Sequence, residues 1–168
     1  IKNLINDGNV NKNQVYVAGA SSGGGATMRF LMQYPEIFAG AIACCSMDPI
    51  VPVHNQTFAA LGREKDPFDT IVSNFEEAFQ GNVYTWDEST QSMVSKKIET
   101  QKLLDVQVYY KHTENDPTCN VDSSKAMYKA MENMGDKNNK LSIWSDDEMK
   151  AVGISNGMGG TLLHWSWV

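Results

Sequence analysis

The residues best suited to chemistry begin with the run Gly19–Gly23, which matches the pattern G-x-S-x-G around Ser21. In this pattern a serine sits on a sharp turn between a strand and a helix, and the flanking glycines leave room for neighbouring backbone. The surrounding sequence fits, because Gln14–Ala18 predicts a strand and Ala26–Tyr34 predicts a helix with one apolar face. We therefore predict that Ser21 is a nucleophile.

Two other functions use a strand, a glycine-rich turn and a helix, and both are excluded here. A phosphate-binding P-loop needs lysine after its last glycine, but Ala26 and Thr27 follow the glycine run. A dinucleotide-binding fingerprint starting at Gly23 needs a third glycine where this chain has Met28.

Ser22 is a competitor for the role of nucleophile, since Ala20-x-Ser22-x-Gly24 is a variant of the same pattern. Ser21 is favoured because glycine occupies both of its flanking motif positions. With Ser21 as the nucleophile, we expect the backbone N–H of Ser22 to contribute to an oxyanion hole.

A serine nucleophile needs an imidazole within hydrogen-bonding reach to remove its proton. The chain has three histidines. His54 and His112 read as polar loop or packing residues, whereas His164 follows the last predicted strand. We predict that His164 is the base, and the alternative is a side chain packed between neighbouring tryptophans.

The base in turn needs a carboxylate to hold its tautomer. Asp116 lies just beyond a predicted strand, at the edge where parallel-sheet active sites form. Asp-Pro is also a common turn, and Glu114 and Asp122 are the alternates. The chain order Ser21, Asp116, His164 is the order of the α/β-hydrolases.

Composition narrows the class of protein that could carry these residues. The 168 residues carry a formal net charge of −6, with 42% hydrophobic and 20% charged residues, as in an ordinary globular domain. No stretch is long and apolar enough to span a membrane, and no basic cluster suggests a nucleic-acid partner. Three cysteines fit no zinc spacing, so we expect neither a metal nor a cofactor.

The elements that would position the site are alternating strands and helices. The apolar run 38–45 predicts a strand buried on both faces, which is typical of a parallel sheet. The remaining predicted elements are the strands Val106–Tyr110 and Leu141–Trp144, the helix Asp122–Met134, and the end of a helix over residues 1–6.

We expect an insertion at residues 48–104, without strands. Helical spacing predicts one helix beginning at Asp66-Pro67 and ending at Gly81, and a second over Gln91–Leu104. The insertion could form a lid over the site, although the apolar stripe of the first helix is more typical of packing on the domain.

Two segments of the chain, the run Val15–Gly24 and the run Tyr34–Ala39, have a distinctive sequence. They resemble α/β-hydrolase esterases of the polyhydroxybutyrate-depolymerase, feruloyl-esterase and "predicted peptidase" group. Members of this group often have H-G-x-x-D-x-x-V around the catalytic acid. The corresponding run His112–Cys119 keeps the aspartate but departs at its second and last positions. The group also has a tryptophan shortly after the catalytic histidine, as Trp167 is here.

The resemblance implies an α/β-hydrolase fold, with a mostly parallel sheet flanked by helices and a helical insertion. It implies a serine hydrolase that cleaves carboxylic esters through an acyl-enzyme, with no cofactor. Trp165 and Trp167 could line a substrate pocket or anchor the terminal loop. The alternatives are a peptidase like prolyl oligopeptidase, and a non-catalytic binding module with the hydrolase fold.

The cysteines leave two possibilities open. Cys44 or Cys45 could form a disulfide with Cys119 across neighbouring strands, or all three could be buried thiols. A disulfide would indicate a secreted or extracellular protein, which is the usual setting of the esterases that the chain resembles.

The motif lies unusually close to Ile1 for this fold, which normally has several strands before the nucleophile. We therefore expect residues 1–168 to be the C-terminal portion of one α/β-hydrolase domain, without the N-terminal strands. Its expected partners are an ester substrate and either the missing N-terminal segment or a companion chain that completes the sheet.

Overall fold

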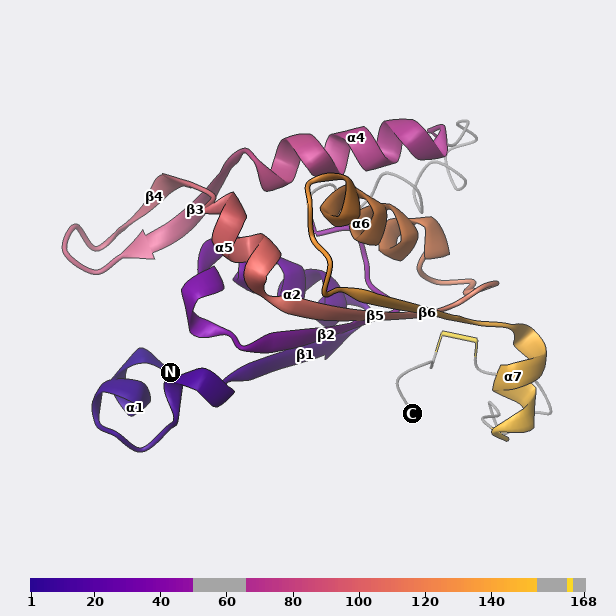
Figure 1. Ribbon diagram of the computed structural model, residues 1–168, viewed down its shortest axis with the longest axis horizontal. Helices are drawn as coiled ribbons and strands as arrows, with labels where there is room; N and C mark the ends of the chain where they lie inside the picture. The colour runs from indigo at the N-terminus through magenta and orange to yellow at the C-terminus, as the bar shows by residue number, and fades with distance from the viewer. Residues whose placement is uncertain (50–65, 154–162, 165–168) are drawn as a thin grey trace.

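The computed structural model describes residues 1–49, 66–153 and 163–164 (Figure 1). Its strands are β1 (Tyr16–Ala20), β2 (Gly40–Cys44), β3 (Asn82–Asp87), β4 (Ser92–Lys97), β5 (Gln107–Thr113) and β6 (Lys140–Trp144). Its α-helices are α1 (Lys2–Asn6), α2 (Ser22–Gln33), α4 (Phe68–Phe79), α5 (Thr100–Asp105), α6 (Val121–Asn133) and α7 (Asp146–Ala151).

Four strands form a parallel sheet in the order β1-β2-β5-β6. This confirms the parallel sheet expected from the apolar run at β2. The expectation that this strand is buried on both faces is wrong, because Ile42 at its centre is exposed on the face that the described helices do not cover. Parallel strands all end at one edge of the sheet, so the residues that follow β1, β2 and β5 meet there. Ser21, Cys45 and Asp116 are such residues.

The helices α2, α5 and α6 lie on one face of the sheet, and α4 packs on the outside of α6 (Figure 1). Phe75 and Phe79 of α4 are buried in the same core as Met127 and Met131 of α6. The apolar stripe of this helix therefore packs on the domain. The segment 50–65, which belongs to the expected insertion and includes His54, lies outside the described residues.

The predicted helix over Gln91–Leu104 is wrong. Residues 82–97 form the antiparallel hairpin β3–β4, and only the end of the predicted range is helical, as α5. The hairpin projects away from the sheet (Figure 1), so several of its apolar side chains are exposed, including Tyr84, Trp86 and Met93. Because little of it is buried, its strands lack the strict alternation that identifies a half-buried strand in a sequence.

The three cysteines are buried thiols and do not form a disulfide. The cysteines therefore provide no support for secretion. The strand β5 continues three residues beyond the predicted strand, which puts His112 within it. The helix α7 was also missed, although Ser145 and Glu148 form a capping box at its start.

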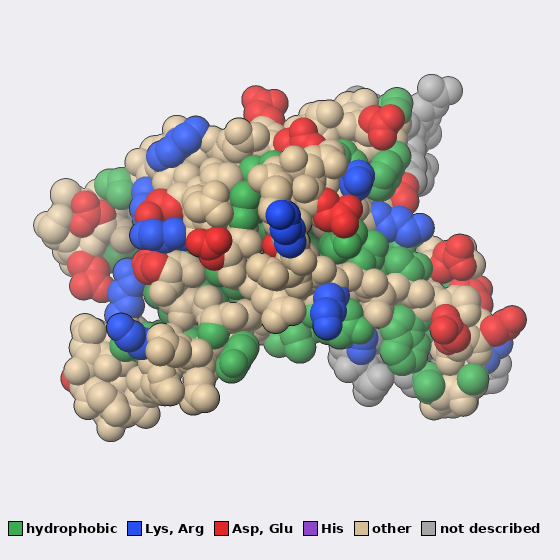
Figure 2. Space-filling model, in the orientation of Figure 1, with side chains coloured by type: hydrophobic (Ala, Val, Ile, Leu, Met, Phe, Trp, Pro, Cys, Tyr) green, Lys and Arg blue, Asp and Glu red, His purple; other side chains and the backbone are tan. Residues whose placement is uncertain are grey.

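On the face shown in Figure 2, lysine and arginine side chains are dispersed among aspartate and glutamate. Acidic side chains gather at the first turn of α7, where Asp146, Asp147 and Glu148 lie. Among the described residues, no helix combines the length and apolar character that crossing a membrane requires.

Candidate active site

Ser21 occupies a strained turn between β1 and α2. Its φ of 59° and ψ of −122° lie in a region that side chains other than glycine rarely adopt. Hydrogen bonds hold the turn in place: the Ser21 N–H donates to the Cys44 carbonyl at 2.9 Å, and the Met47 N–H donates to the Ser21 carbonyl at 3.1 Å. The end of β2 therefore fixes the backbone of the predicted nucleophile.

Two glycines allow this turn to form. A Cβ at Gly19 would lie 2.1 Å from the Gly23 carbonyl oxygen, and a Cβ at Gly24 would lie 2.9 Å from the Cys44 carbonyl oxygen. A Cβ at Gly23 would meet nothing within 4 Å. The close approach that the motif predicts therefore occurs at Gly19 and Gly24, and not at Gly23.

The structure brings Asp116 and His164 together, although 48 positions separate them in the chain. The His164 Nδ1 lies 2.7 Å from Asp116 Oδ2, which is a strong hydrogen-bond distance. A carboxylate only accepts, so Nδ1 carries the hydrogen and Nε2 of the neutral ring keeps its lone pair. This is the tautomer that a general base needs. The alternative carboxylates, Glu114 and Asp122, lie elsewhere: Glu114 is exposed, and Asp122 lies in the first turn of α6.

Asp116 has a fully buried side chain and accepts four hydrogen bonds. Oδ1 accepts from the N–H groups of Thr118 and Cys119, at 2.7 and 2.9 Å. Oδ2 accepts from His164 and from His112 Nε2, the latter at 3.3 Å. Burial alone raises the pKa of Asp116, but the bonds from His112, Cys119, His164 and Thr118 together outweigh it and hold the pKa below its ordinary value.

His112 was predicted to be a loop or packing residue, and it instead supports Asp116 from within β5. Its side chain is fully buried. Its Nε2 donates to the Cys119 carbonyl at 3.0 Å, and its Nδ1 lies 2.7 Å from the Ser124 hydroxyl. The ring therefore ties the loop that carries Asp116 to the start of α6. The sequence signal for this role is the position of His112, four residues before Asp116.

Ser21 lies in the same neighbourhood as the Asp116–His164 pair. Its Oγ is 3.9 Å from Cys119 Sγ, and the N–H of Cys119 is one of the Asp116 donors. Ser22 is the first residue of α2, where N–H groups have no carbonyl partner within the helix. Its N–H is thus placed beside the Ser21 turn. Trp165 and Trp167 lie outside the described residues.

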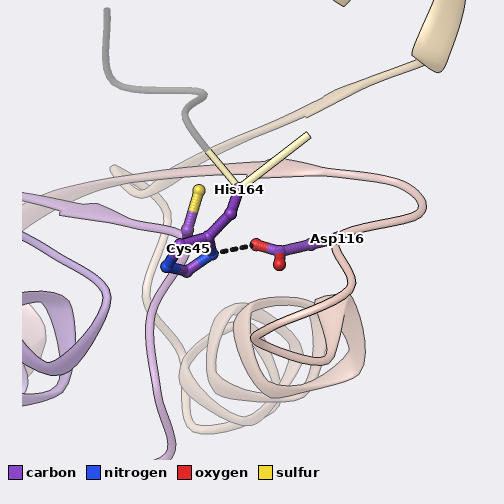
Figure 3. A group of neighbouring side chains, drawn as sticks. All are labelled: Cys45, Asp116 and His164. Carbon is purple, nitrogen blue, oxygen red and sulfur yellow. Dashed lines mark hydrogen bonds and ion pairs between the residues drawn. The ribbon is translucent and has the colours of Figure 1, made fainter. Parts of the chain in front are cut away.

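Cys45 is a further side chain at this site that sequence reasoning did not assign to it. It follows β2 with a φ of 43°, and its N–H donates to the Lys111 carbonyl at 2.7 Å. Figure 3 shows the Cys45 thiol beside the His164 ring, and Asp116 hydrogen-bonded to the same ring. One ligand atom from each of Cys45, Asp116 and His164 lies within 4.8 Å of the other two.

A groove of about 980 Å³ is lined by parts of α1, β1, α2 and the hairpin, including Tyr16 and Trp86. Tyr16 begins β1, whereas Ser21 follows the end of that strand. The groove therefore lies at the opposite end of β1 from Ser21, and it is separate from the candidate active site.

Solved structures with the same fold include hydrolases of two kinds. The chain aligns with a thermostable esterase at a TM-score of 0.57 and 20% identity, over 99% of this chain and 30% of that one. A PHB depolymerase complexed with an R3HB trimer aligns at a TM-score of 0.54 and 18% identity, over 82% and 39%. A dipeptidyl aminopeptidase IV from Bacteroides ovatus aligns at a TM-score of 0.50 and 16% identity, over 86% and 18%.

These likenesses show the α/β-hydrolase fold, and the chain spans well under half the length of those three proteins. No curated protein sequence matches the chain. The model of the prolyl oligopeptidase family, Peptidase_S9, matches residues 1–148, which include the Ser21 turn and the loop with Asp116. The chain therefore belongs to the prolyl oligopeptidase family of hydrolases.

Proposed function

We propose that this protein hydrolyses carboxylic esters through an acyl-enzyme, with Ser21 as nucleophile, His164 as base and Asp116 as the carboxylate that orients the base. The main support is the 2.7 Å hydrogen bond between His164 Nδ1 and Asp116 Oδ2. That bond puts the ring hydrogen on Nδ1, so that Nε2 of the neutral ring carries the lone pair a base needs. Ser21, in its strained turn, follows a strand of the same sheet and lies at the same edge as the Asp116 loop.

In the first step, Ser21 Oγ attacks the ester carbonyl carbon while His164 Nε2 takes the hydroxyl proton. The carbonyl oxygen becomes an oxyanion, and the N–H of Ser22 donates a hydrogen bond to it. When the bond to the leaving alcohol breaks, His164 passes the proton to the alcohol oxygen. Asp116 stays ionised throughout and stabilises the imidazolium that forms.

In the second step, water replaces the alcohol and the same groups act again. His164 takes a proton from water, the hydroxide attacks the acyl carbon, and the carbon–oxygen bond to Ser21 breaks. The proton then returns to Ser21 Oγ, and the carboxylic acid leaves. The low pKa of Asp116 supports this cycle, because the carboxylate is ionised across the pH range in which an imidazole exchanges protons.

Amide hydrolysis is the second candidate, because the same three groups cleave peptides. Two observations favour it: the chain belongs to the prolyl oligopeptidase family, and a dipeptidyl aminopeptidase shares its fold. We rank esters first because the folds that align with higher TM-scores are those of an esterase and a depolymerase.

The test compares turnover of a p-nitrophenyl acyl ester with that of a peptide p-nitroanilide, and labels the protein with a fluorophosphonate. We expect ester turnover to exceed amide turnover, and label on Ser21. The Ser21→Ala variant should lose about 10⁴-fold or more in kcat, whereas Ser22→Ala, which keeps its N–H, should retain activity. Activity in Ser21→Ala that Ser22→Ala abolishes would move the nucleophile to Ser22. A natively folded protein that takes no label would indicate a binding module.

A further inference from the structure

The group formed by Cys45, Asp116 and His164 has the composition of a metal site as well as of a catalytic one. It offers one sulfur, one oxygen and one nitrogen, all within 4.8 Å of one another (Figure 3). The three residues come from three separate places: the end of β2, the loop after β5, and the described segment 163–164. The fold itself therefore assembles the cluster.

The donor set selects the class of ion. A cysteine thiolate and an imidazole nitrogen are the usual ligands of Zn²⁺, and carboxylate oxygens also bind it. Mg²⁺ and Ca²⁺ prefer oxygen ligands, so a site with one sulfur and one nitrogen disfavours both. A cluster of this composition fits Zn²⁺ best.

The geometry also indicates where the ion would lie. Asp116 contacts the Nδ1 edge of His164, so an ion that touches both residues must lie at Nδ1. In a tetrahedral zinc site the ligand atoms are about 3.3–3.6 Å apart. The Nδ1–Oδ2 pair at 2.7 Å must therefore open slightly. The three ligand atoms already lie within 4.8 Å of one another, so only local shifts are needed to reach that spacing. The His164 side chain is 16% exposed, so it has room to shift outward.

We propose that Zn²⁺ binds to Cys45 Sγ, Asp116 Oδ2 and His164 Nδ1, with water as the fourth ligand, and thereby inhibits the hydrolase. The inhibition rests on the proposed function, whereas the binding does not. On binding, the Cys45 thiol loses its proton to solvent and a sulfur–zinc bond forms. The imidazole keeps its single proton, which moves from Nδ1 to Nε2 as the zinc–nitrogen bond forms.

The consequence for catalysis follows from the tautomer. A base must present a lone pair at Nε2 to the Ser21 hydroxyl, and the zinc-bound ring presents an N–H there instead. The ion also neutralises the charge of Asp116 that would stabilise an imidazolium. Zinc therefore acts as a reversible inhibitor that holds the base in the wrong tautomer.

Cys44 provides a matched control for Cys45, since it is the adjacent buried thiol. It lies within β2, and burial raises the pKa of its thiol despite the nearby Lys111 ammonium. It is not part of the cluster. Replacing Cys44 by serine should thus change a buried thiol without changing the zinc site.

Binding is tested with Co²⁺, which replaces Zn²⁺ and gives a thiolate-to-cobalt absorption band in the near ultraviolet. We expect the wild-type chain to give this band at one ion per chain, with release of a proton. The band should be lost in Cys45→Ser, kept in Cys44→Ser, and altered in His164→Ala. A wild-type chain without the band, or a band that persists in Cys45→Ser, overturns the site. Circular dichroism checks that each variant is folded.

Inhibition is tested by titrating Zn²⁺ into the ester assay, with each variant normalised to its own rate in EDTA. The inhibition constant should weaken at least about tenfold in Cys45→Ser, since even outer-shell changes cost about 10–100-fold in metal affinity. Mg²⁺ should not inhibit. A cobalt band without ester turnover would refute the proposed function and leave the site standing. Turnover that neither Zn²⁺ nor Co²⁺ affects, in a chain that gives no band, would refute only the zinc site.

Discussion

Asp116 is shared between two histidines, and the two have different environments. His112 is fully buried and bonded at both ring nitrogens, so its ring is held in one orientation. His164 is partly exposed and is held by its Nδ1 bond to Asp116. The first histidine thus acts as a positioning residue for the carboxylate, and the second is the proposed base.

Replacing His112 tests this division of roles. The His112→Ala variant removes the hydrogen bonds of the ring with the Ser124 hydroxyl and the Cys119 carbonyl, which should cost about 1–3 kcal/mol in the free energy of unfolding. It should also lower kcat for the ester. The His112→Gln variant keeps a donor near Nε2 and should recover part of both losses. Urea unfolding and steady-state kinetics measure the two effects, and an equal loss of kcat in both variants would contradict the positioning role.

The lowered pKa of Asp116 predicts how stability depends on pH. Because the folded pKa lies below the unfolded value of about 3.9, the carboxylate contributes stability that is fully present above that value. This contribution is lost as the pH falls through the folded pKa. The Asp116→Asn variant lacks it, so the stability difference between wild type and variant should shrink below about pH 4. Urea unfolding from pH 7 to pH 2.5 measures that difference, and a constant difference would contradict the assignment.

At the level of single residues, motif spacing and chain order predict Ser21, Asp116 and His164, and the structure brings Asp116 and His164 into contact. Spacing and order could not identify Cys45. Its thiol reaches His164 only because the chain leaves β2 with a positive φ, which the residues around it do not encode as a motif. His112 was visible in the sequence, but its role depends on β5 running on to Thr113.

At the level of elements, the Ser21 turn depends on the contact of α2 with β1 and β2. Gly19→Ala would place a Cβ 2.1 Å from the Gly23 carbonyl oxygen, so the turn would have to open. We expect a loss of about 2 kcal/mol or more in stability and a large loss of activity. Gly23→Ala is the matched control, because its Cβ meets nothing and alanine favours a helix by about 0.5–1 kcal/mol. Thermal unfolding compares them, and equal melting temperatures would contradict this account of the turn.

The elements with strong periodicity were predictable, and those with little burial were not. The strands β2, β5 and β6 and the helices α4 and α6 have apolar residues at the spacing that the core requires. The hairpin β3–β4 has several exposed apolar side chains, so its sequence lacks the alternation of apolar and polar residues that burial of one face requires. Its run Val83–Trp86 has strand propensity, which the expectation of an insertion without strands overlooks.

At the level of the whole molecule, β1 is an edge of the described sheet, and part of one sheet face is uncovered. Tyr16 of β1 and Ile42 of β2 are 69% and 41% exposed. An exposed edge next to an apolar face tends to pair with another strand. We propose that a further strand, from another segment of the full protein or from a companion chain, pairs with β1.

This proposal predicts that the 168-residue chain associates with itself through β1. A lysine at the edge should discourage pairing, so Tyr16→Lys should lower the apparent mass at high concentration. Tyr84→Lys is the control, since Tyr84 is similarly exposed but lies on the hairpin. Light scattering after size-exclusion chromatography measures the mass. A monomeric wild-type chain, or the same effect in both variants, would contradict pairing at β1.

The bonds that fix Ser21 also have a consequence for amide hydrogen exchange. Residues at active-site turns usually exchange their amide protons early, through local opening. The Ser21 N–H instead donates to the carbonyl of Cys44 at the end of β2. The N–H of the following residue, Cys45, donates to the Lys111 carbonyl in β5. Opening the turn would thus require β2 to separate from its neighbours. The Ser21 amide should exchange as slowly as the amides of the central strands do, and only when the sheet itself unfolds.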